Sequence, residues 1–343
     1  MQQYIIKETS SIKDALVALN SIAHDMLTLF VVNAEDQMVG SLTDGDIRRG
    51  LISGAQLSEQ VCTVMHRDFK FINQSEFNVS LFKDFRDRKI LYIPILDEQR
   101  RIVDVVNLQK HKSYLPIDAV LMAGGKGERL RPLTDKTPKP LLMVGDKCII
   151  DHNVDRLISY GVNHLNVTVN YLGEQIEEHY MQLRNGVKVR TFREPKFLGT
   201  IGSVKFVDSF YNDTILVMNS DLFTNIDYED FFLHFKLHDA DMSVAAVPYN
   251  VSIPYGILEL EGRVVKGLAE KPKYNYYANA GIYLIKKKEL DEIPDNEFFN
   301  ATDLIDKLIS QNKKVIRYPL NGTWFDIGTP TEYQKALDFV KHI

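Results

Sequence analysis

The segment LMAGGKGERLRPL, at residues 121–133, combines a glycine-rich turn with a high density of cations. An apolar run leads into three glycines, at positions 124, 125 and 127. Glycines that follow a strand let backbone N–H groups approach an anion closely. The cations that follow are Lys126, Arg129, Arg131, Lys136 and Lys139. A structural turn needs no such charge, whereas a triphosphate does. The segment therefore predicts a phosphate-binding loop.

The spacing of this loop excludes two familiar phosphate-binding motifs. A P-loop requires GxxxxGK[ST], and no Lys-Ser or Lys-Thr follows at that distance. A dinucleotide fingerprint requires GxGxxG, but after Gly125 and Gly127 the third glycine position holds Leu130. The loop must belong to another class.

The longer segment LMAGGKGERLRPLTDKTPKPLLMVGDK resembles the signature of sugar-1-phosphate nucleotidyltransferases, GGxGxRLxPLT followed by PKP. Further segments resemble motifs of that family and occur in the family's order: EPKFLGTIGS, LVMNSDLF, YGILEL, AEKP, NAGIYLI and WFDIGTP. The resemblance covers about residues 117–343. Glu128 stands where many members have threonine, and we expect its side chain to point outward.

The resemblance implies a site that binds a nucleoside triphosphate and a sugar-1-phosphate. The implied nucleotide-binding residues are Met122, Ala123, Gly124, Gly125, Gly127, Arg129, Glu194, Gly199 and Thr200. Arg129 should bind the β- and γ-phosphates, and Lys139 should lie near the α-phosphate and the sugar phosphate. The implied sugar-phosphate contacts are Lys139, Gly256, Glu270, Lys271 and Asn279.

Two carboxylates are implied as ligands of a Mg²⁺ cofactor. Asp221 ends the apolar run TILVMNSD, and ligands bind at the carboxyl ends of parallel strands. Mg²⁺ takes one or two protein carboxylates and completes its shell with phosphate and water oxygens. By resemblance the second carboxylate is Asp326, in WFDIGTP. The expected catalytic set is thus Arg129, Lys139, Asp221, Lys271 and Asp326.

The implied reaction needs charge compensation more than proton transfer. A phosphate monoester has a second pKa near ~6, so the attacking phosphate is already mostly dianionic at neutral pH. Catalysis should rest on positioning and cations that bring two polyanions together. The sequence shows no convincing Ser/His/Asp or Cys/His set, which agrees with this expectation. His234 and His238 are four residues apart but lack the HExxH glutamate, so a polar helix face is expected.

Glu194 occupies the segment that reads the nucleobase in the family. Guanine presents two adjacent donors, N1–H and N2–H₂, and one carboxylate accepts both. Uracil and thymine offer a single donor flanked by carbonyl oxygens. We therefore expect a preference for GTP, with Gly199 and Thr200 closing on the base through their backbone. The alternative is that Glu194 pairs with Arg193 or Lys196 at the surface.

The first third of the chain contains an internal repeat. VVNAEDQMVGSLTDGD starts at Val31 and ILDEQRRIVDVVNLQK starts at Ile95, and the two align without a gap. Each follows a helix-like segment, SIKDALVALN or NVSLFKDFRD, and the first has Ser10 or Ser11 as its cap. Neither unit buries its apolar face alone, so the two should pack as a pair. The tandem resembles a pair of CBS domains over residues 1–112.

The CBS resemblance implies one nucleotide site at most. The first repeat keeps the GxxTxxD element as Gly40, Thr43 and Asp46. The equivalent positions of the second repeat hold Asp104, Asn107 and Lys110. We expect a purine nucleotide at the first element, or a module that only dimerises the chain. In both cases the expected assembly is a homo-oligomer with paired CBS modules.

The second part of the chain, from residue 117 to 343, alternates strand-like and helix-like segments. Strands are expected at AVLMA, HLNVTV, VKVRTF and TILVM, and helices at residues 150–159, 174–183 and 202–210. A final helix should begin at Pro330 with Thr329 as its cap. The alternation predicts an α/β fold with a mainly parallel sheet. The resemblance makes this sheet Rossmann-like and GT-A-like, preceded by the α+β tandem CBS module.

Composition excludes several classes of function. The chain has 343 residues and a net charge of −5, and neither part is strongly basic, so no nucleic-acid partner is expected. The N-terminus has no basic region followed by an apolar run, and no apolar stretch is long enough to cross a bilayer. Cys62 and Cys148 form no CxxC pair, which is typical of a reducing cytoplasm.

Three functions remain open at this stage. The first is an active nucleotidyltransferase, and the fusion to a CBS tandem resembles enzymes that make GDP-glucosamine from GTP and glucosamine-1-phosphate for legionaminic-acid-type sugars. Other hexose-1-phosphates, and UTP, dTTP or CTP, remain alternatives. The second is a non-catalytic sensor of nucleotide sugars, although such a copy should have lost part of its charged set. The third changes the acceptor to a phosphorylated alcohol such as phosphocholine.

Overall fold

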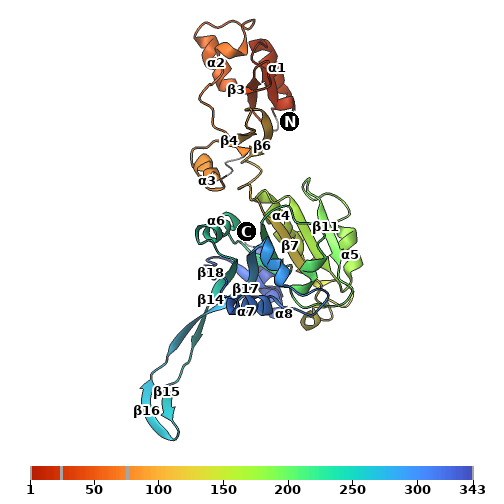
Figure 1. Cartoon of the computed structure of the whole chain (residues 1–343), viewed down its shortest axis with the longest axis vertical. Coiled ribbons are helices and arrows are strands. Elements are labelled where there is room, and N and C mark those ends of the chain that lie inside the picture. The colour runs from red at the N-terminus through yellow and green to blue at the C-terminus, as the bar shows by residue number, and fades with distance from the viewer. Residues whose placement is uncertain (1, 24–25, 75–77, 342–343) are drawn as a thin grey trace. The chain divides into compact units, whose positions relative to one another are not determined.

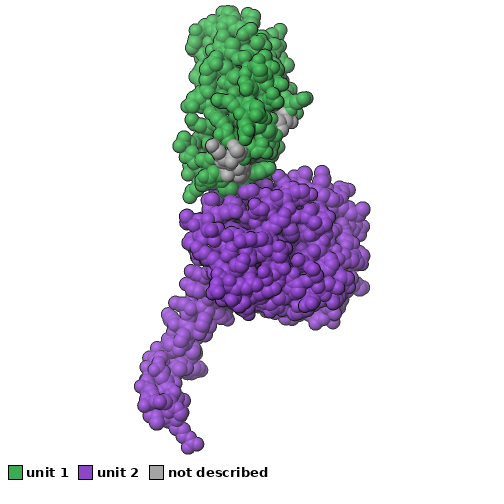
Figure 2. All heavy atoms as spheres, in the orientation of Figure 1, with its two compact units in different colours: residues 1–114 green, residues 115–343 purple. Residues whose placement is uncertain are grey.

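The computed structural model describes residues 2–23, 26–74 and 78–341. The chain divides into two compact units, Met1–Tyr114 and Leu115–Ile343, which Figure 2 colours separately. Within the described ranges, no helix has both the length and the apolar character that a membrane span requires.

Unit 1 consists of two similar three-stranded sheets. The first contains β1 (Ile5–Lys7), β2 (Thr28–Val32) and β3 (Met38–Thr43), and the second contains β4 (Ile72–Asn73), β5 (Tyr92–Leu96) and β6 (Ile102–Asn107). In both sheets a parallel pair is followed by an antiparallel pair. The internal repeat predicted from the sequence is therefore present as a repeated structural unit.

The helices of unit 1 show where the two repeats differ. The helices are α1 (Ile12–Ser21), α2 (Asp44–Ile52) and α3 (Ser80–Asp87). Ser11 caps α1, and the Asp14 side chain accepts from the Ser11 backbone in return. Thr43 and Asp46 form the same reciprocal box at the start of α2. After β6 the chain makes a turn and no helix equivalent to α2 follows.

Unit 2 is built on a seven-stranded mixed sheet with the order β11-β10-β7-β12-β17-β14-β18 (Figure 1). Its strands are β7 (Asp118–Ala123), β10 (His164–Val169), β11 (Val189–Arg193), β12 (Thr214–Asn219), β14 (Met242–Ser252), β17 (Lys273–Lys286) and β18 (Val315–Pro319). Only β17 runs antiparallel to its neighbours. The mainly parallel sheet predicted from the sequence is confirmed, with this one reversed strand.

The strand order creates a switch point between β7 and β12. From β7 the chain adds β10 and β11 on one side, then crosses to place β12 on the other side. At such a point the loops after the two central strands diverge and leave a crevice outside their carboxyl ends. The glycine-rich loop follows β7, and Asp221 follows β12, so both open into the same crevice.

The described residues of unit 2 contain the α-helices α4 (Ile149–Ser159), α5 (Gly173–His179), α6 (Tyr228–Leu237), α7 (Ala301–Ser310) and α8 (Pro330–Val340). The predictions for α4 and for the Thr329 cap of α8 are confirmed. The helix predicted over 174–183 ends at His179. The prediction of an α-helix over 202–210 was wrong, because residues Gly202–Phe206 form a 3₁₀ segment and residues 207–210 belong to no helix or strand.

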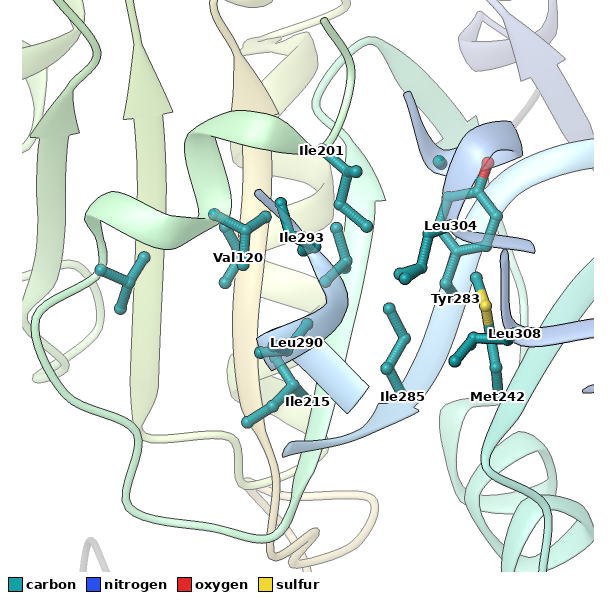
Figure 3. Packing of buried hydrophobic residues seen from close by; sticks show 14 residues of the cluster. Val120, Ile201, Ile215, Met242, Tyr283, Ile285, Leu290, Ile293, Leu304 and Leu308 are labelled. Atoms are coloured by element: carbon teal, nitrogen blue, oxygen red, sulfur yellow. The ribbon is translucent and has the colours of Figure 1, made fainter. Parts of the chain in front are cut away.

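The main apolar core of unit 2 lies between the sheet and α7. Val120, Val217 and Ile285 contribute from three adjacent strands, and Leu304 and Leu308 contribute from α7 (Figure 3). All five side chains are fully buried. Burial of this kind supplies the main driving force that fixes the central strands in place. The loops after those strands therefore start from rigid positions.

Short paired strands and a long arm complete unit 2. The short pairs are β8 (Met143–Val144) with β9 (Lys147–Cys148), and β13 (Leu222–Thr224) with β19 (Trp324–Asp326). The arm is formed where β14 and β17 continue beyond the sheet and lead into β15 (Ile257–Glu261) and β16 (Val264–Ala269). Figure 1 shows it as a slender ribbon that leaves the body of unit 2. The sequence predicted hairpins in this region but not a projecting arm.

Candidate active site

A cavity of about 580 Å³ lies at the carboxyl ends of β7 and β12. All nine residues predicted to bind the nucleotide line it: Met122, Ala123, Gly124, Gly125, Gly127, Arg129, Glu194, Gly199 and Thr200. Lys139 and Asp221 line it as well. Its volume lies in the range usual for small-molecule and cofactor sites.

The glycine-rich loop needs glycine at its turn for two reasons. Gly127 has φ +62°, a left-handed conformation that other residues adopt at a cost. A Cβ there would lie 3.0 Å from Thr134 Cγ2 and 3.1 Å from Lys139 Cβ. The Thr134 hydroxyl also donates to the Gly127 carbonyl at 2.8 Å. These contacts hold the loop against the segment that carries Lys139.

Arg129 belongs to a short 3₁₀ turn, Glu128–Leu130, that follows the loop. A Cβ on Gly328 would lie 3.0 Å from Arg129 Nη2, so the glycine leaves room for the guanidinium. Glu128, the departure from the family pattern, is exposed at the rim of the cavity. Because Glu128 is exposed and also lines the cavity, the outward orientation of its side chain stays a prediction.

Lys139 is a buried cation, and only 8% of its surface is exposed. It lies between Pro138 and Pro140, at the start of a 3₁₀ turn. Its ammonium forms an ion pair with the carboxylate of Asp221. A buried charge is tolerated when it is paired, because pairing offsets part of the cost of desolvation. The two prolines and the ion pair fix Lys139 toward the cavity.

The β13–β19 pair brings the two predicted metal ligands together. Leu222, next to Asp221, pairs with Asp326, and the Ile327 amide donates to the Asp221 carbonyl at 3.2 Å. Asp326 lines an adjoining hollow that shares Arg129 and Gly328 with the main cavity. Burial raises the pKa of Asp326, and the Asp221 carboxylate raises it further, against the opposing effect of Lys139.

The carboxylate pair fits a hard divalent cation. The Oδ1 atom of Asp221 is buried and has no hydrogen-bond partner within the described part of the chain. An unpaired buried oxygen is costly and calls for a ligand. Two carboxylates at the edge of a cavity supply the oxygen donors that Mg²⁺ prefers, and leave most of its shell for phosphate and water.

Glu194 is buried at the opposite side of the cavity, with 3% of its surface exposed. The Leu198 amide donates to its Oε2 atom at 3.1 Å. A Cβ on Gly124 would lie 2.4 Å from Oε1, so the glycine-rich strand end admits the carboxyl group. Burial raises the pKa of Glu194 to about 7, and the Leu198 amide lowers it only in part.

The surface alternative for Glu194 is wrong. Arg193 is paired with Glu174 and Glu177 on α5 and does not approach Glu194. Desolvation without a cation beside it accounts for the raised pKa of Glu194. The carboxyl group is therefore available to a ligand in the cavity.

The loop after Glu194 positions Gly199 and Thr200, and it also places Phe197, which was not predicted from the sequence, in the lining of the cavity. Gly199 has φ +80°, and a Cβ there would lie 2.6 Å from the Phe299 carbonyl. The Thr200 amide donates to Asn300 Oδ1 at 3.2 Å, so this N–H is engaged within the protein. Phe197 lines the cavity and is 51% exposed. It lies inside the EPKFLG segment, and its aromatic type beside Glu194 was the available signal.

The predicted sugar-phosphate residues Gly256, Glu270 and Lys271 do not line the cavity. They lie together on the arm, where a Cβ on Gly256 would approach Glu270 Oε2 to 3.0 Å. Glu270 and Lys271 are exposed there. Lys271 has φ +45° immediately before a proline, a strained conformation of the kind found at functional sites.

Asn279, the fourth residue predicted to contact the sugar, is engaged within the sheet. Its amide donates to Tyr283 Oη at 2.9 Å, and its carbonyl oxygen accepts from the Gly281 amide at 2.9 Å. These contacts stabilise β17 near the base of the arm, and Asn279 does not line the cavity.

Two other clusters of metal-binding residue types are structural. Cys148, Asp151 and His179 lie close together, but Arg184 contacts Asp151 at 3.1 Å and occupies the place of a cation. The rings of His234 and His238 have centroids 4.3 Å apart and are tilted by 38°, and the His238 ring forms a hydrogen bond with the His234 carbonyl. This agrees with the polar helix face expected from the sequence.

Replacement of Glu194 should show that its carboxyl group is buried without a counter-ion. The pKa of Glu194 in the folded chain is about 7, above its ordinary value of 4.5, so the folded state binds the proton more tightly than the unfolded state. The resulting contribution to the free energy of unfolding is complete below pH 4.5 and is lost as the pH rises through about 7. Glu194→Gln should avoid that loss and raise the free energy of unfolding at alkaline pH by up to about 3 kcal/mol. Urea denaturation followed by fluorescence of the single tryptophan, Trp324, measures this. The exposed Glu128→Gln is the control, and parallel pH profiles for wild type and Glu194→Gln would contradict the assignment.

Comparison with known proteins places these features in a family. The family model described as "Nucleotidyl transferase" matches residues 118–342. The bifunctional protein GlmU of Methanocaldococcus jannaschii is 32% identical over 231 residues, which cover 65% of this chain and 54% of that protein. The mannose-1-phosphate guanylyltransferase catalytic subunit beta of Xenopus tropicalis is 28% identical over 234 residues, 64% of this chain and 63% of that protein.

A solved structure supports the fold. HddC from Yersinia pseudotuberculosis complexed with GMP-PN aligns with a TM-score of 0.51 and 23% identity, over 65% of this chain and 99% of that one. The chain spans less than two thirds of the length of the curated relatives that it matches. Since the family model covers most of unit 2, and the glycine-rich loop, Lys139, Asp221 and Asp326 all fall within that match, the chain belongs to the nucleotidyl transferase family.

Proposed function

We propose that this protein transfers a nucleotidyl group from a nucleoside triphosphate to a sugar-1-phosphate. An oxygen of the sugar phosphate forms a bond to the α-phosphorus, the bond from that phosphorus to the β-phosphate oxygen breaks, and pyrophosphate leaves. The observation that carries this proposal is the cavity at the switch point, which gathers the glycine-rich loop, Arg129, Lys139 and Asp221 around one space.

The cations of the cavity provide the charge compensation that this reaction needs. Arg129 binds the β- and γ-phosphates and stabilises the charge that builds up on pyrophosphate. Lys139 lies beside Asp221, where the α-phosphate and the attacking phosphate would meet. Backbone N–H groups of the loop after β7 orient the triphosphate. None of these roles requires proton transfer, which suits a nucleophile that is already anionic.

The carboxylates Asp221 and Asp326 would hold Mg²⁺. When bound, this ion would supply positive charge against the phosphate oxygens. The orphaned Oδ1 atom of Asp221 and the proximity of Asp326 support this assignment. A non-catalytic sensor would be expected to have lost at least one of four charged residues, and all four are present: Arg129, Lys139, Asp221 and Asp326. This favours an enzyme over a nucleotide-sugar sensor.

We propose GTP as the preferred nucleotide. A buried carboxyl group with a pKa of about 7 is poised to ionise when two donors face it, as N1–H and N2–H₂ of guanine would. Phe197 offers an aromatic face beside it for a base. Several relatives are named guanylyltransferases, and the HddC structure contains GMP-PN. These observations support guanine over a pyrimidine.

The most specific form of the proposal is GTP plus glucosamine-1-phosphate giving GDP-glucosamine and pyrophosphate. Its support is the fusion of unit 2 to a CBS-like tandem, since no single residue of the cavity selects the sugar. A pyrophosphate-release screen of GTP, UTP, dTTP, CTP and ATP against hexose, heptose and hexosamine 1-phosphates tests it, with phosphocholine included. If pyrophosphate is released only with mannose- or heptose-1-phosphate, that sugar phosphate would replace glucosamine-1-phosphate in the proposal. If no pair of substrates releases pyrophosphate, the proposed function is refuted.

We also propose that unit 1 binds one purine nucleotide. A cavity of about 800 Å³ lies between its two repeats, lined by Thr43, Asp44, Lys70, Lys89 and Tyr92 among others. Gly40 packs against Met65, and Asp46 is engaged by Thr43 and Arg49, so these two residues support the site rather than line it. Asp104, Asn107 and Lys110 of the second repeat do not line the cavity either, so the single-site proposal rests on their residue types.

Loss of either metal ligand should abolish most turnover. Asp221→Asn and Asp326→Asn should each reduce kcat by at least about 100-fold at saturating Mg²⁺, because the charge that offsets the phosphates would be lost. Pyrophosphate release measures turnover, and circular dichroism checks the fold. The exposed Asp291→Asn is the matched control and should retain full activity. Near-normal turnover of Asp221→Asn or Asp326→Asn would contradict the assignment of that residue as a metal ligand.

Glu194 should set the choice of base in a pH-dependent way. Glu194→Gln should lower the ratio of GTP to UTP turnover by about 10-fold or more, since a paired carboxylate acceptor is lost. In the wild type the same ratio should fall as the pH drops below about 7, where the carboxyl group becomes protonated. The variant should show no such pH dependence. An unchanged ratio at all pH values would rule out base recognition by Glu194.

Titration calorimetry of the full chain should detect a nucleotide at unit 1. AMP, ADP and ATP are compared with guanine nucleotides, and Lys70→Ala should weaken the binding of the preferred one about 10-fold by removing a phosphate contact. Lys13→Ala, outside the cavity, should leave the affinity unchanged. Two equivalent sites in unit 1 would refute the single-site proposal. Absence of binding by every one of these nucleotides would contradict the proposal and favour the alternative in which unit 1 only dimerises the chain.

A further inference from the structure

The arm of unit 2 exposes an apolar surface that its own fold does not cover. In the register of β15 with β16, Leu258 pairs with Leu268 and Leu260 pairs with Val265, so four apolar side chains share one face. Each is between 54% and 64% exposed. A two-stranded ribbon is marginally stable in water by itself, and exposed apolar faces mark interaction sites. We therefore expect the apolar face of the arm to pack against another surface.

The base of the arm adds exposed aromatic surface. Tyr249 and Tyr276 pair across β14 and β17 and are 60% and 56% exposed. Tyr255 and Tyr277 are 73% and 58% exposed. With roughly 150–250 Å² for each aromatic side chain, the arm exposes apolar surface on the order of 1,000 Å², against about 800 Å² per partner in a standard interface. Two exchanged arms would suffice for a stable dimer.

The arm also carries residues that the transfer reaction needs. Gly256, Glu270 and Lys271 lie together where the β14–β17 ladder meets the β15–β16 ladder. The ladder is continuous from the Ala246–Asn279 pair to the Ser252–Lys273 pair, which holds Lys271 roughly 20 Å beyond the sheet. Arg317 stacks on Tyr277 at 3.9 Å and fixes the base of the arm to the body. A return to its own cavity would require breaking this ladder.

The cavity, in turn, lacks Gly256, Glu270 and Lys271 of the predicted sugar-phosphate residues, and it has an apolar rim. No arm residue lines it. At its edge Phe197 and Phe298 form an exposed aromatic pair, 5.9 Å apart and 51% and 59% exposed. The arm leaves the sheet at the same edge as the cavity, because β14 runs parallel to β12. An arm from a second molecule can reach such a cavity with its ladder intact.

We propose that two copies of this chain exchange arms, and that each arm places Glu270 and Lys271 in the nucleotide cavity of the partner subunit. A second copy is the occupant because Glu270 and Lys271 are useful only beside a nucleotidyltransferase cavity. The exchange is isologous, so a closed dimer results. The apolar face of the arm packs at the rim formed by Phe197 and Phe298, and Lys271 completes the cation set for the sugar phosphate. This inference rests on the proposed function for the role of Lys271.

Complementation between two inactive variants tests the exchange. Lys271→Ala damages the arm and leaves the cavity intact, whereas Asp221→Asn damages the cavity and leaves the arm intact. The two full-length chains are co-expressed with different tags, and the doubly tagged species is isolated. With exchanged arms, one of its two sites combines an intact cavity with an intact arm, so about half of the wild-type turnover per dimer returns. If each arm serves its own cavity, turnover stays at the level of the single variants, and the proposal is overturned. Absence of a doubly tagged species overturns it as well.

A photocrosslink separates this inference from the proposed function. The photoreactive amino acid p-benzoylphenylalanine replaces Leu260 at the arm tip, and irradiation should give a covalent species of twice the 39.4 kDa chain mass. Peptide mapping should join the arm to the cavity rim of the other chain. The same substitution at Leu237, which is 81% exposed on α6, is the control and should remain monomeric. If the crosslink joins two chains but the wild type has no transferase activity, the proposed function is refuted and the arm exchange is supported. Crosslinks that form only within one chain would overturn the arm exchange.

Discussion

The ion pair between Lys139 and Asp221 is the interaction on which the site depends. Only 11% of the Lys139 side chain and 23% of the Asp221 side chain is exposed, so pairing offsets part of the desolvation cost of both charges. The pair ties the segment after the glycine-rich loop to the end of β12. It also concentrates charge that can act on phosphate, because electrostatic interactions strengthen where water is excluded.

The rest of the cavity follows from how the sheet is wound. The reversal of strand order between β7 and β12 opens the crevice, and the β13–β19 pair brings Asp326 to Asp221. The buried core beneath the sheet keeps these strand ends rigid. Glu194 reaches the far side of the same crevice from the end of β11, where burial without a cation raises its pKa. The lining of the cavity therefore combines the cations Arg129 and Lys139 with the buried carboxyl group of Glu194.

The two units use different means to form a cavity. In unit 2 the cavity lies at the strand ends of one sheet, whereas in unit 1 it lies between two repeats that are each too small to enclose one. The capping box of Thr43 and Asp46 shows how a motif associated with ligands also serves the fold, since the same carboxylate starts α2. Loss of the equivalent helix after β6 makes the two halves of unit 1 unequal.

The sequence by itself determined the local features. Glycine positions, strand ends and the Thr329 cap follow from short-range rules, because backbone freedom and periodicity are read within a few residues. The nucleotide-binding residues were implied by the resemblance of their motifs to a known family. Tertiary structure alone decided the rest. Residues Gly202–Phe206 form a 3₁₀ turn where an α-helix was predicted, and the Gly202 amide donates to the carbonyl of Phe299, far along the chain. The separation of Glu270 and Lys271 from the cavity depends on the long β14–β17 ladder, and the raised pKa of Glu194 depends on what surrounds it. Burial and long-range pairing are properties of the folded chain, and no local pattern encodes them.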